Sequence, residues 1–232
     1  MTDNSRTDYE LACCFERDLY LQPALSGDED LLIPASYPER FSSPLLLSST
    51  TFRKTRNSLD LSISAADILE DVRTLTLSIK SHSPTKTSIT KIQSTAAWLH
   101  KQLQTKYLKP MLASETDLIF ETIRLAALIY SSCIVSLTPF GSQRNEPLMQ
   151  EFHSNIFQVS LARWKETPGI FLWILLIAAP SSGNDARGRF LKKKMAVAGM
   201  SIGLEDFNLA TGHLRAFWEV QRWIAREGQR TE

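Results

Sequence analysis

Histidines are the side chains in this sequence best suited to binding a metal ion or moving a proton near neutral pH. There are four, and each lies in a different helical segment: His82, His100, His153 and His213. No pair has the three- or four-residue spacing that brings two ligands to one face of a helix. We therefore predict that the chain binds no metal ion and that each histidine lies at the surface or the edge of the core.

Carboxylates and cysteines show no pattern of a catalytic or metal site either. The densest acidic cluster, Asp28-Glu29-Asp30, lies in a proline-interrupted stretch and is a poor site for a divalent metal ion. Cys13 and Cys14 are adjacent and Cys133 is distant, which is no zinc-ligand spacing and no disulfide framework. The chain also lacks a phosphate-binding loop. We predict no catalytic residue, no cofactor and no enzyme activity.

The main local concentration of charge is a basic group formed by Arg187, Arg189 and Lys192–Lys194. To contact DNA it would need aromatic or polar base-reading neighbours, or symmetric presentation by a dimer, and the sequence shows neither. We interpret it as a solvated face. A second basic stretch, Phe52–Arg56, has the composition of a nuclear address, although a solvated charge run is the simpler interpretation.

Composition describes a soluble globular protein, with 232 residues, 43% hydrophobic and 22% charged. The formal net charge of +1 gives no overall field to attract nucleic acid or an anionic membrane. The N-terminus is polar and acidic, so we expect no secretory signal and no membrane anchor. We also expect a reducing compartment, because three cysteines give no sign of a disulfide framework.

The element that must organise these residues is the apolar run Ile170–Ala179, bounded by Pro168 and Pro180. It is about half the ~20 residues that a membrane-spanning helix needs. A short helix that is apolar on every side is a buried one, so we predict a central helix at about 170–180. A buried strand is the alternative for so short a run, but the helical patterns on both sides favour a helix.

Apolar residues with helical spacing predict further helices around this run, each with a buried stripe. Two of these stripes are Ile68, Val72, Leu75 and Ile79 in one helix, and Leu191, Met195, Ala198 and Ile202, with Phe190 beside them, in another. One helix begins near the cap Ser64-Ala-Ala-Asp67, and the others cover about 89–107, 115–137, 151–163, 190–202 and 207–224. In contrast, Pro23–Leu61 is rich in proline, serine and threonine and indicates a disordered connector. We predict an all-α, irregular multi-helix bundle over 64–232. Residues 1–63 form a mostly disordered N-terminal segment with a short helix at 8–21.

Three segments together resemble the fungal-specific transcription factor domain, the regulatory region of fungal zinc-cluster transcription factors. Glu121–Tyr130 is similar to its helix C/A-x-R-L-A-A-L-L-Y, and Phe171–Ala179 is similar to its helix L-L-W-x-L-F-x-G-A. Arg187–Leu191, followed by the pair Phe217-Trp218, is similar to the region after them. The likeness covers about Ser64 to Arg226, and the order and separations of the segments fit.

The resemblance implies a nuclear, all-helical regulatory domain that gates transcriptional activation; a cytoplasmic protein is the alternative. Its partners would be proteins of the transcription machinery, a second copy of the chain, or a small apolar ligand. Zinc-cluster factors contact DNA through a cluster held by six cysteines, and this chain has three cysteines in all. Direct DNA binding therefore does not carry over.

Two other classes of function stay open on the residues alone. A helical enzyme or binding protein for an apolar metabolite would need polar groups at a shared pocket, and only Glu121, Arg124 and Tyr130 stand near the predicted core. A dimerising scaffold could use Trp218 and Trp223 as interface anchors, unless both cap the core of their own chain.

Overall fold

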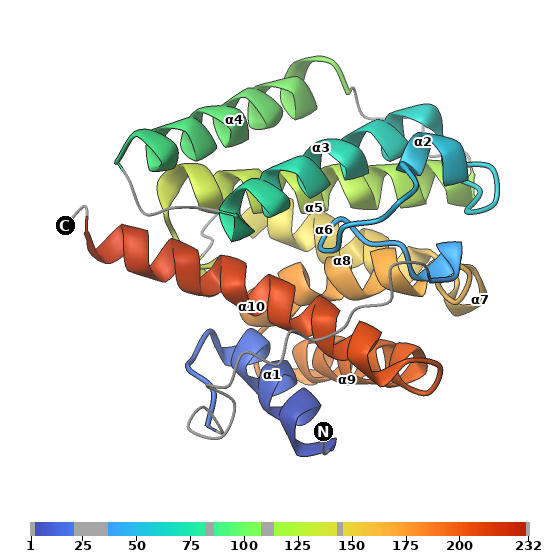
Figure 1. Ribbon diagram of the computed structural model, residues 1–232. Helices are drawn as coiled ribbons and strands as arrows, with labels where there is room; N and C mark the ends of the chain where they lie inside the picture. The colour runs from blue at the N-terminus through green and yellow to red at the C-terminus, as the bar shows by residue number, and fades with distance from the viewer. Residues whose placement is uncertain (1–2, 21–36, 82–85, 108–113, 143–145, 231–232) are drawn as a thin grey trace.

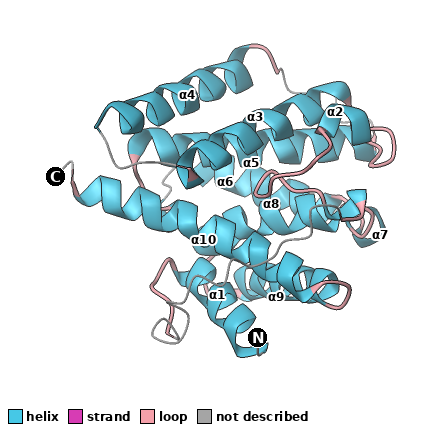
Figure 2. Ribbon diagram, in the orientation of Figure 1, coloured by secondary structure: helices cyan, strands magenta, loops and turns pink. Residues whose placement is uncertain are grey.

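The computed structural model describes residues 3–20, 37–81, 86–107, 114–142 and 146–230 (Figure 1). Within these ranges the chain forms ten α-helices and two short 3-10 turns, and it contains no strand (Figure 2). The helices are α1 (Asp3–Phe15), α2 (Phe52–Thr55), α3 (Ile63–Lys80), α4 (Lys86–Thr105), α5 (Glu115–Ser136), α6 (Glu146–Gln158), α7 (Leu161–Trp164), α8 (Pro168–Ser181), α9 (Ala186–Gly203) and α10 (Phe207–Gln229). The predicted all-α class is confirmed.

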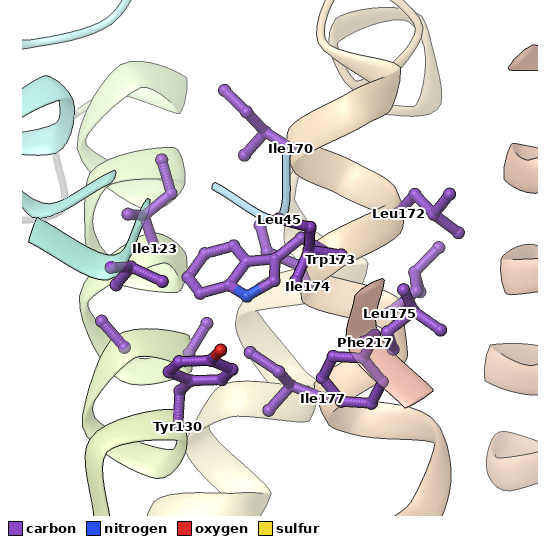
Figure 3. Close-up of a cluster of buried hydrophobic side chains, with 14 of the residues drawn as sticks. Leu45, Ile123, Tyr130, Ile170, Leu172, Trp173, Ile174, Leu175, Ile177 and Phe217 are labelled. Carbon is purple, nitrogen blue, oxygen red and sulfur yellow. The ribbon is translucent and has the colours of Figure 1, made fainter. Parts of the chain in front are cut away.

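Helix α8 is the predicted central helix, and it begins with Pro168, whose fixed φ suits the first helical position. Every residue from Pro168 to Ala179 is buried, and α1, α5, α6, α9 and α10 all pack against the helix. Figure 3 shows how its sides are used: the Trp173 ring points toward α5, whereas Leu172 and Leu175 point away from it. The architecture predicted around about 170–180 is therefore confirmed.

Helix α5 is the second buried element and is long and apolar enough to cross a membrane. In this fold, however, 78% of its most apolar window is buried against the rest of the chain, as in the core helix of a globular protein. It begins with a capping box, in which the Ser114 hydroxyl accepts from the Asp117 N–H and the Asp117 carboxylate accepts from the Ser114 N–H.

Most predicted helix faces point inward, and the exceptions are local. In α3 the stripe Ile68, Val72, Leu75 and Ile79 is buried as expected, but the cap is Ser62, whose hydroxyl accepts from the Ala65 N–H. The helix predicted at 151–163 is two helices, because Ser160 interrupts it and caps α7. As a result Leu161 is exposed. Trp98 of α4 is exposed as well, so its ring does not join the buried face of that helix.

The N-terminal helix is shifted from its predicted position and turned about its axis. It covers Asp3–Phe15 instead of 8–21, and it packs on α10 and α8. Ala12 and Cys13 are fully buried, whereas Leu11 and Phe15 are largely exposed. The apolar pattern alone favoured the face of Leu11 and Phe15, but the packing partner selected the neighbouring face.

Residues 37–61, here named the strap, were expected to be disordered, but the structure shows them folded onto the helices. Six of their side chains enter the core: Phe41, Leu45, Leu46, Phe52, Leu59 and Leu61. Residues 21–36, which include the acidic cluster Asp28–Asp30, lie outside the described residues. The core is thus shared between the strap and the helices that follow it.

Three buried side chains from distant elements bond the carbonyl groups of the strap. Arg73 of α3 donates to the Ser43 carbonyl at 3.4 Å and the Thr50 carbonyl at 3.2 Å. Arg163 of α7 donates to the carbonyls of Leu59 at 2.8 Å and Asp60 at 2.7 Å, and the His213 ring of α10 lies 3.2 Å from the Phe41 carbonyl. Irregular backbone needs such partners when it is buried, because it lacks the regular backbone hydrogen bonds of a helix or a sheet.

His213 should make the stability of this fold depend on pH. Burial lowers the pKa of His213 to about 4, and the Leu209 and Phe41 carbonyls oppose that shift only in part. The unfolded chain takes up a proton near pH 6.5, so it binds more protons than the folded chain between about 6.5 and 4. We expect the free energy of unfolding to fall as pH falls through that window, by about 3 kcal/mol at most.

Urea denaturation between pH 7 and 4.5 measures this effect. Carboxylates also titrate in the lower part of that range, so the comparison is with His213→Gln, which removes the imidazole. The variant should lose less stability than the parent over the same interval. Equal losses would show that His213 does not contribute.

Candidate functional site

The polar residues predicted near the core form hydrogen bonds with other groups inside the fold. Glu121 is fully buried, and Arg124 bonds both of its carboxylate oxygens, at 2.8 and 2.6 Å, as well as the Leu103 carbonyl. The Tyr130 hydroxyl lies 2.8 Å from the Thr76 hydroxyl, and burial raises its pKa. Glu121 and Arg124, three residues apart on α5, therefore form a bidentate ion pair whose carboxylate is fully buried.

The three histidines in the described part of the chain lie on three different helices. His82 lies outside the described residues, His100 bonds Ser131 on α5, and His153 and His213 lie on α6 and α10. All three cysteines are buried. Among the residues that the structure describes, no group of three or more histidine, cysteine, aspartate or glutamate side chains could hold a metal ion.

Trp218 and Trp223 both serve the core of their own chain. Trp223 is 1% exposed, and the Trp218 indole donates to the Arg17 carbonyl at 3.1 Å and packs edge-on against Tyr9 of α1. Neither ring is presented as an interface anchor, so these two tryptophans no longer support the hypothesis of a dimerising scaffold.

The basic stretch Phe52–Arg56 is also built into the fold. Phe52 is fully buried, with the Arg73 guanidinium 4.1 Å above its ring, and Arg53 forms an ion pair with Asp67. Residues 52–55 form the short helix α2. In the folded chain this stretch is not an extended basic peptide.

A charged surface does appear on the first half of α9, where the basic cluster consists of Arg187, Arg189, Lys192, Lys193 and Lys194. Within the described parts of the chain, none of the five forms an ion pair with a carboxylate. Lys194 Nζ lies 4.9 Å from the centroid of the Phe190 ring, and Lys192 Nζ lies 5.3 Å from that of Phe15. The structure thus supplies the aromatic neighbours that the sequence did not show.

Helix α9 also carries two apolar faces. The predicted stripe Leu191, Met195, Ala198 and Ile202 is buried against the core. A second face, formed by Phe190, Val197, Met200 and Leu204, is 43, 52, 49 and 83% exposed. At about 100° per residue these four positions lie within an arc of about 80° on the outer side of the helix. Phe190, expected beside the buried stripe, belongs to this outer face.

Two surface hollows of about 290 Å³ each adjoin the basic cluster. One lies between α6 and the start of α9 and is lined by His153, Ser154, Phe157, Gln158 and Arg187. Burial lowers the pKa of His153, which favours the neutral form of its ring. The other lies between the end of α1 and the α8–α9 turn and includes Phe15, Asn184 and Lys192. Their volume is at the lower end of the range for ligand pockets and suits one or two side chains of a partner.

Sequence reasoning found the basic cluster but missed the second face of α9. The signal was present, because residues 190, 197, 200 and 204 follow one another at spacings of seven, three and four. The inner stripe has the more regular helical spacing, so the sequence pattern places Phe190 beside that stripe and not on a separate face. Phe15 and Phe157 had no sequence signal, since they reach the site from α1 and α6.

No protein-family model, no curated protein and no solved structure matches this chain.

Proposed function

We propose that this chain is a regulatory domain of transcription that acts in the nucleus through contact with another protein. The observation that carries the proposal is the packing of the segments that resemble the fungal regulatory domain. They lie on α5, α8, α9 and α10, and the other three helices all pack against α8. The segments with the family-like pattern therefore make up the centre of one fold.

The site itself favours protein contact over catalysis or direct reading of DNA. In the interior Glu121 pairs with Arg124 and Tyr130 bonds Thr76, whereas α9 exposes cations beside apolar side chains. Base edges are read mainly by hydrogen-bonding side chains, whereas Phe190, Val197 and Met200 cannot form such bonds. The chain also lacks the cysteines of a zinc cluster.

A tethering experiment tests the proposal. The full chain is fused to a heterologous DNA-binding domain and expressed in yeast with a reporter that carries the matching sites. We expect the fusion to change reporter output several-fold relative to the DNA-binding domain alone, because the chain brings a regulatory partner to the promoter. Output equal to that of the DNA-binding domain alone, at equal protein level, would contradict the proposed function.

Direct DNA binding is tested separately with the purified, untagged chain. We expect no stoichiometric zinc by metal analysis and no sequence-specific shift of duplex DNA at physiological salt. Zinc at one or two equivalents per chain, or a specific shift, would show that the chain reads DNA itself.

A further inference from the structure

We infer that the second face of α9, together with the basic cluster, binds an acidic amphipathic helix of another protein. This inference names the chemistry of the partner and rests on the proposed function for its biological setting. It is carried by two observations on the same helix: an exposed apolar stripe, and a group of cations that form no ion pair with any carboxylate in the described part of the chain.

The shape of the surface fits a helix. Phe190, Val197, Met200 and Leu204 are spaced as one ridge over four turns of α9. A partner helix with apolar side chains at i, i+3 or i+4, and i+7 would pack along such a ridge. Phe157 of α6 extends the ridge sideways, since its ring centroid lies 5.4 Å from that of Phe190. The hollow beside Phe157 and Arg187 gives room for one anchoring side chain.

The charge of the surface requires an acidic partner. Lys193 lies within the arc of the apolar ridge, and Arg189 and Lys194 lie at its two edges. A carboxylate of the partner would pair with these cations, and it would draw the Lys194 ammonium from the Phe190 ring over which it now lies. The ring would then be free for an apolar contact. Complementary charge of this kind sets the choice of partner and the rate of association.

The same observations disfavour three other occupants. A second copy of α9 would bring the cluster against Glu205 and Asp206, but Glu205 pairs with Arg40 and Asp206 caps α10. DNA offers phosphates to the cations but no partner for the apolar ridge. A membrane-lying helix is flanked by cations along its length, whereas the cations of α9 are confined to its first half.

The test measures binding of a fluorescein-labelled peptide to the purified full chain by fluorescence anisotropy. The peptide is an amphipathic helix of about four turns, with Leu and Phe on one face and Asp and Glu on the other. We expect saturable binding that weakens at least tenfold when the acidic residues are replaced by Lys, and likewise when the apolar residues are replaced by Ala. Binding should also weaken with added salt, because exposed charges are screened.

Two pairs of substitutions place the binding on α9. Arg189→Glu with Lys193→Glu should weaken peptide binding at least tenfold, and so should Val197→Asp with Met200→Asp. The matched control for charge is Lys91→Glu with Lys101→Glu on α4, and the control for an exposed apolar residue is Trp98→Asp. Both controls should bind within about twofold of the parent, because α4 lies on the opposite side of the molecule from α9 (Figure 1).

Several outcomes would overturn the inference. These include equal loss in the α4 controls, full binding by the α9 variants, and full binding by the peptide without apolar residues. Tighter binding to phosphatidylserine vesicles or duplex DNA, abolished by the α9 variants, would assign the surface to that class instead. A dimer in light scattering that Met200→Asp dissociates would assign it to a second copy. Peptide binding fails or succeeds independently of the tethered reporter, so the two proposals are separately testable.

Discussion

Leu175→Asp should abolish folding. Leu175 is fully buried in the middle of α8, and helices from both halves of the chain pack around it. An ionised carboxylate placed there would have neither water nor a cation beside it, and the cost of burying an unpaired charge exceeds the ~5–15 kcal/mol stability of a typical domain. The expected result is a circular dichroism melt without a cooperative transition.

Leu175→Ala tests the same packing without adding a charge. Removing a buried leucine side chain leaves a cavity, and such changes cost ~2–5 kcal/mol. A smaller loss would mean that neighbouring side chains collapse into the space. We expect a cooperative melt with a midpoint several degrees or more below that of the parent, because a chain of this size shifts by ~2–4 °C per kcal/mol.

Leu204→Asp is the matched control, because it makes the same change at a leucine that is 83% exposed. Its melting midpoint should stay close to that of the parent, and its solubility should be equal or better. An unchanged midpoint for Leu175→Asp would contradict the central position of α8, and the run would then be an exposed apolar patch.

The central helix could be predicted because its information is local. Ile170–Ala179 is apolar at every position, and no assignment of faces was needed. The buried faces of α3 and α10 could be predicted for a similar reason, because each of these helices has one clear apolar face. Where a helix has two apolar faces, as α9 has, periodicity alone cannot say which one meets the core.

The strap could not be predicted because its stabilising contacts are distant in sequence. His213 reaches the Phe41 carbonyl across 172 positions, and Arg163 reaches the Leu59 carbonyl across 104. Its serine- and proline-rich composition is typical of disorder. Nothing in the sequence of the strap itself shows that three buried side chains elsewhere in the chain bond its carbonyl groups. The same limit applies to the site, where Phe15 meets Lys192 because α1 packs against α8 and Cys14 of α1 contacts Met195 of α9.

Gly169→Ala should detach the strap from the helices. A Cβ atom at Gly169, in the first turn of α8, would lie 2.2 Å from the Phe41 carbonyl oxygen and 2.6 Å from that of Ser42. These are backbone atoms, and the Phe41 carbonyl also lies against the His213 ring. The backbone at Phe41 cannot move away from an added Cβ atom without breaking its contacts with α8 and with His213. Overpacking usually costs ~1–3 kcal/mol, and we expect a loss of about 3 kcal/mol or more at this site.

The matched control is Gly183→Ala. Gly183 has no positive φ, and a Cβ atom there would meet nothing closer than 3.8 Å. It should leave stability unchanged or raise it by ~0.4–1 kcal/mol, because alanine restricts the unfolded chain more than glycine does. The two substitutions add the same methyl group, so opposite signs would isolate the contact between α8 and the strap.

Limited trypsin digestion locates the effect. In the parent, Arg53 pairs with Asp67 and the adjacent Phe52 is buried, so cleavage within the strap should be slow. In Gly169→Ala the strap should lose its contact with α8. Trypsin should then cut it early, at Arg53, Lys54 or Arg56, while the longer helices stay uncleaved. Cleavage at the parental rate with an unchanged melting midpoint would mean that the strap can shift away from α8 without cost, and that α8 is covered by the other helices alone.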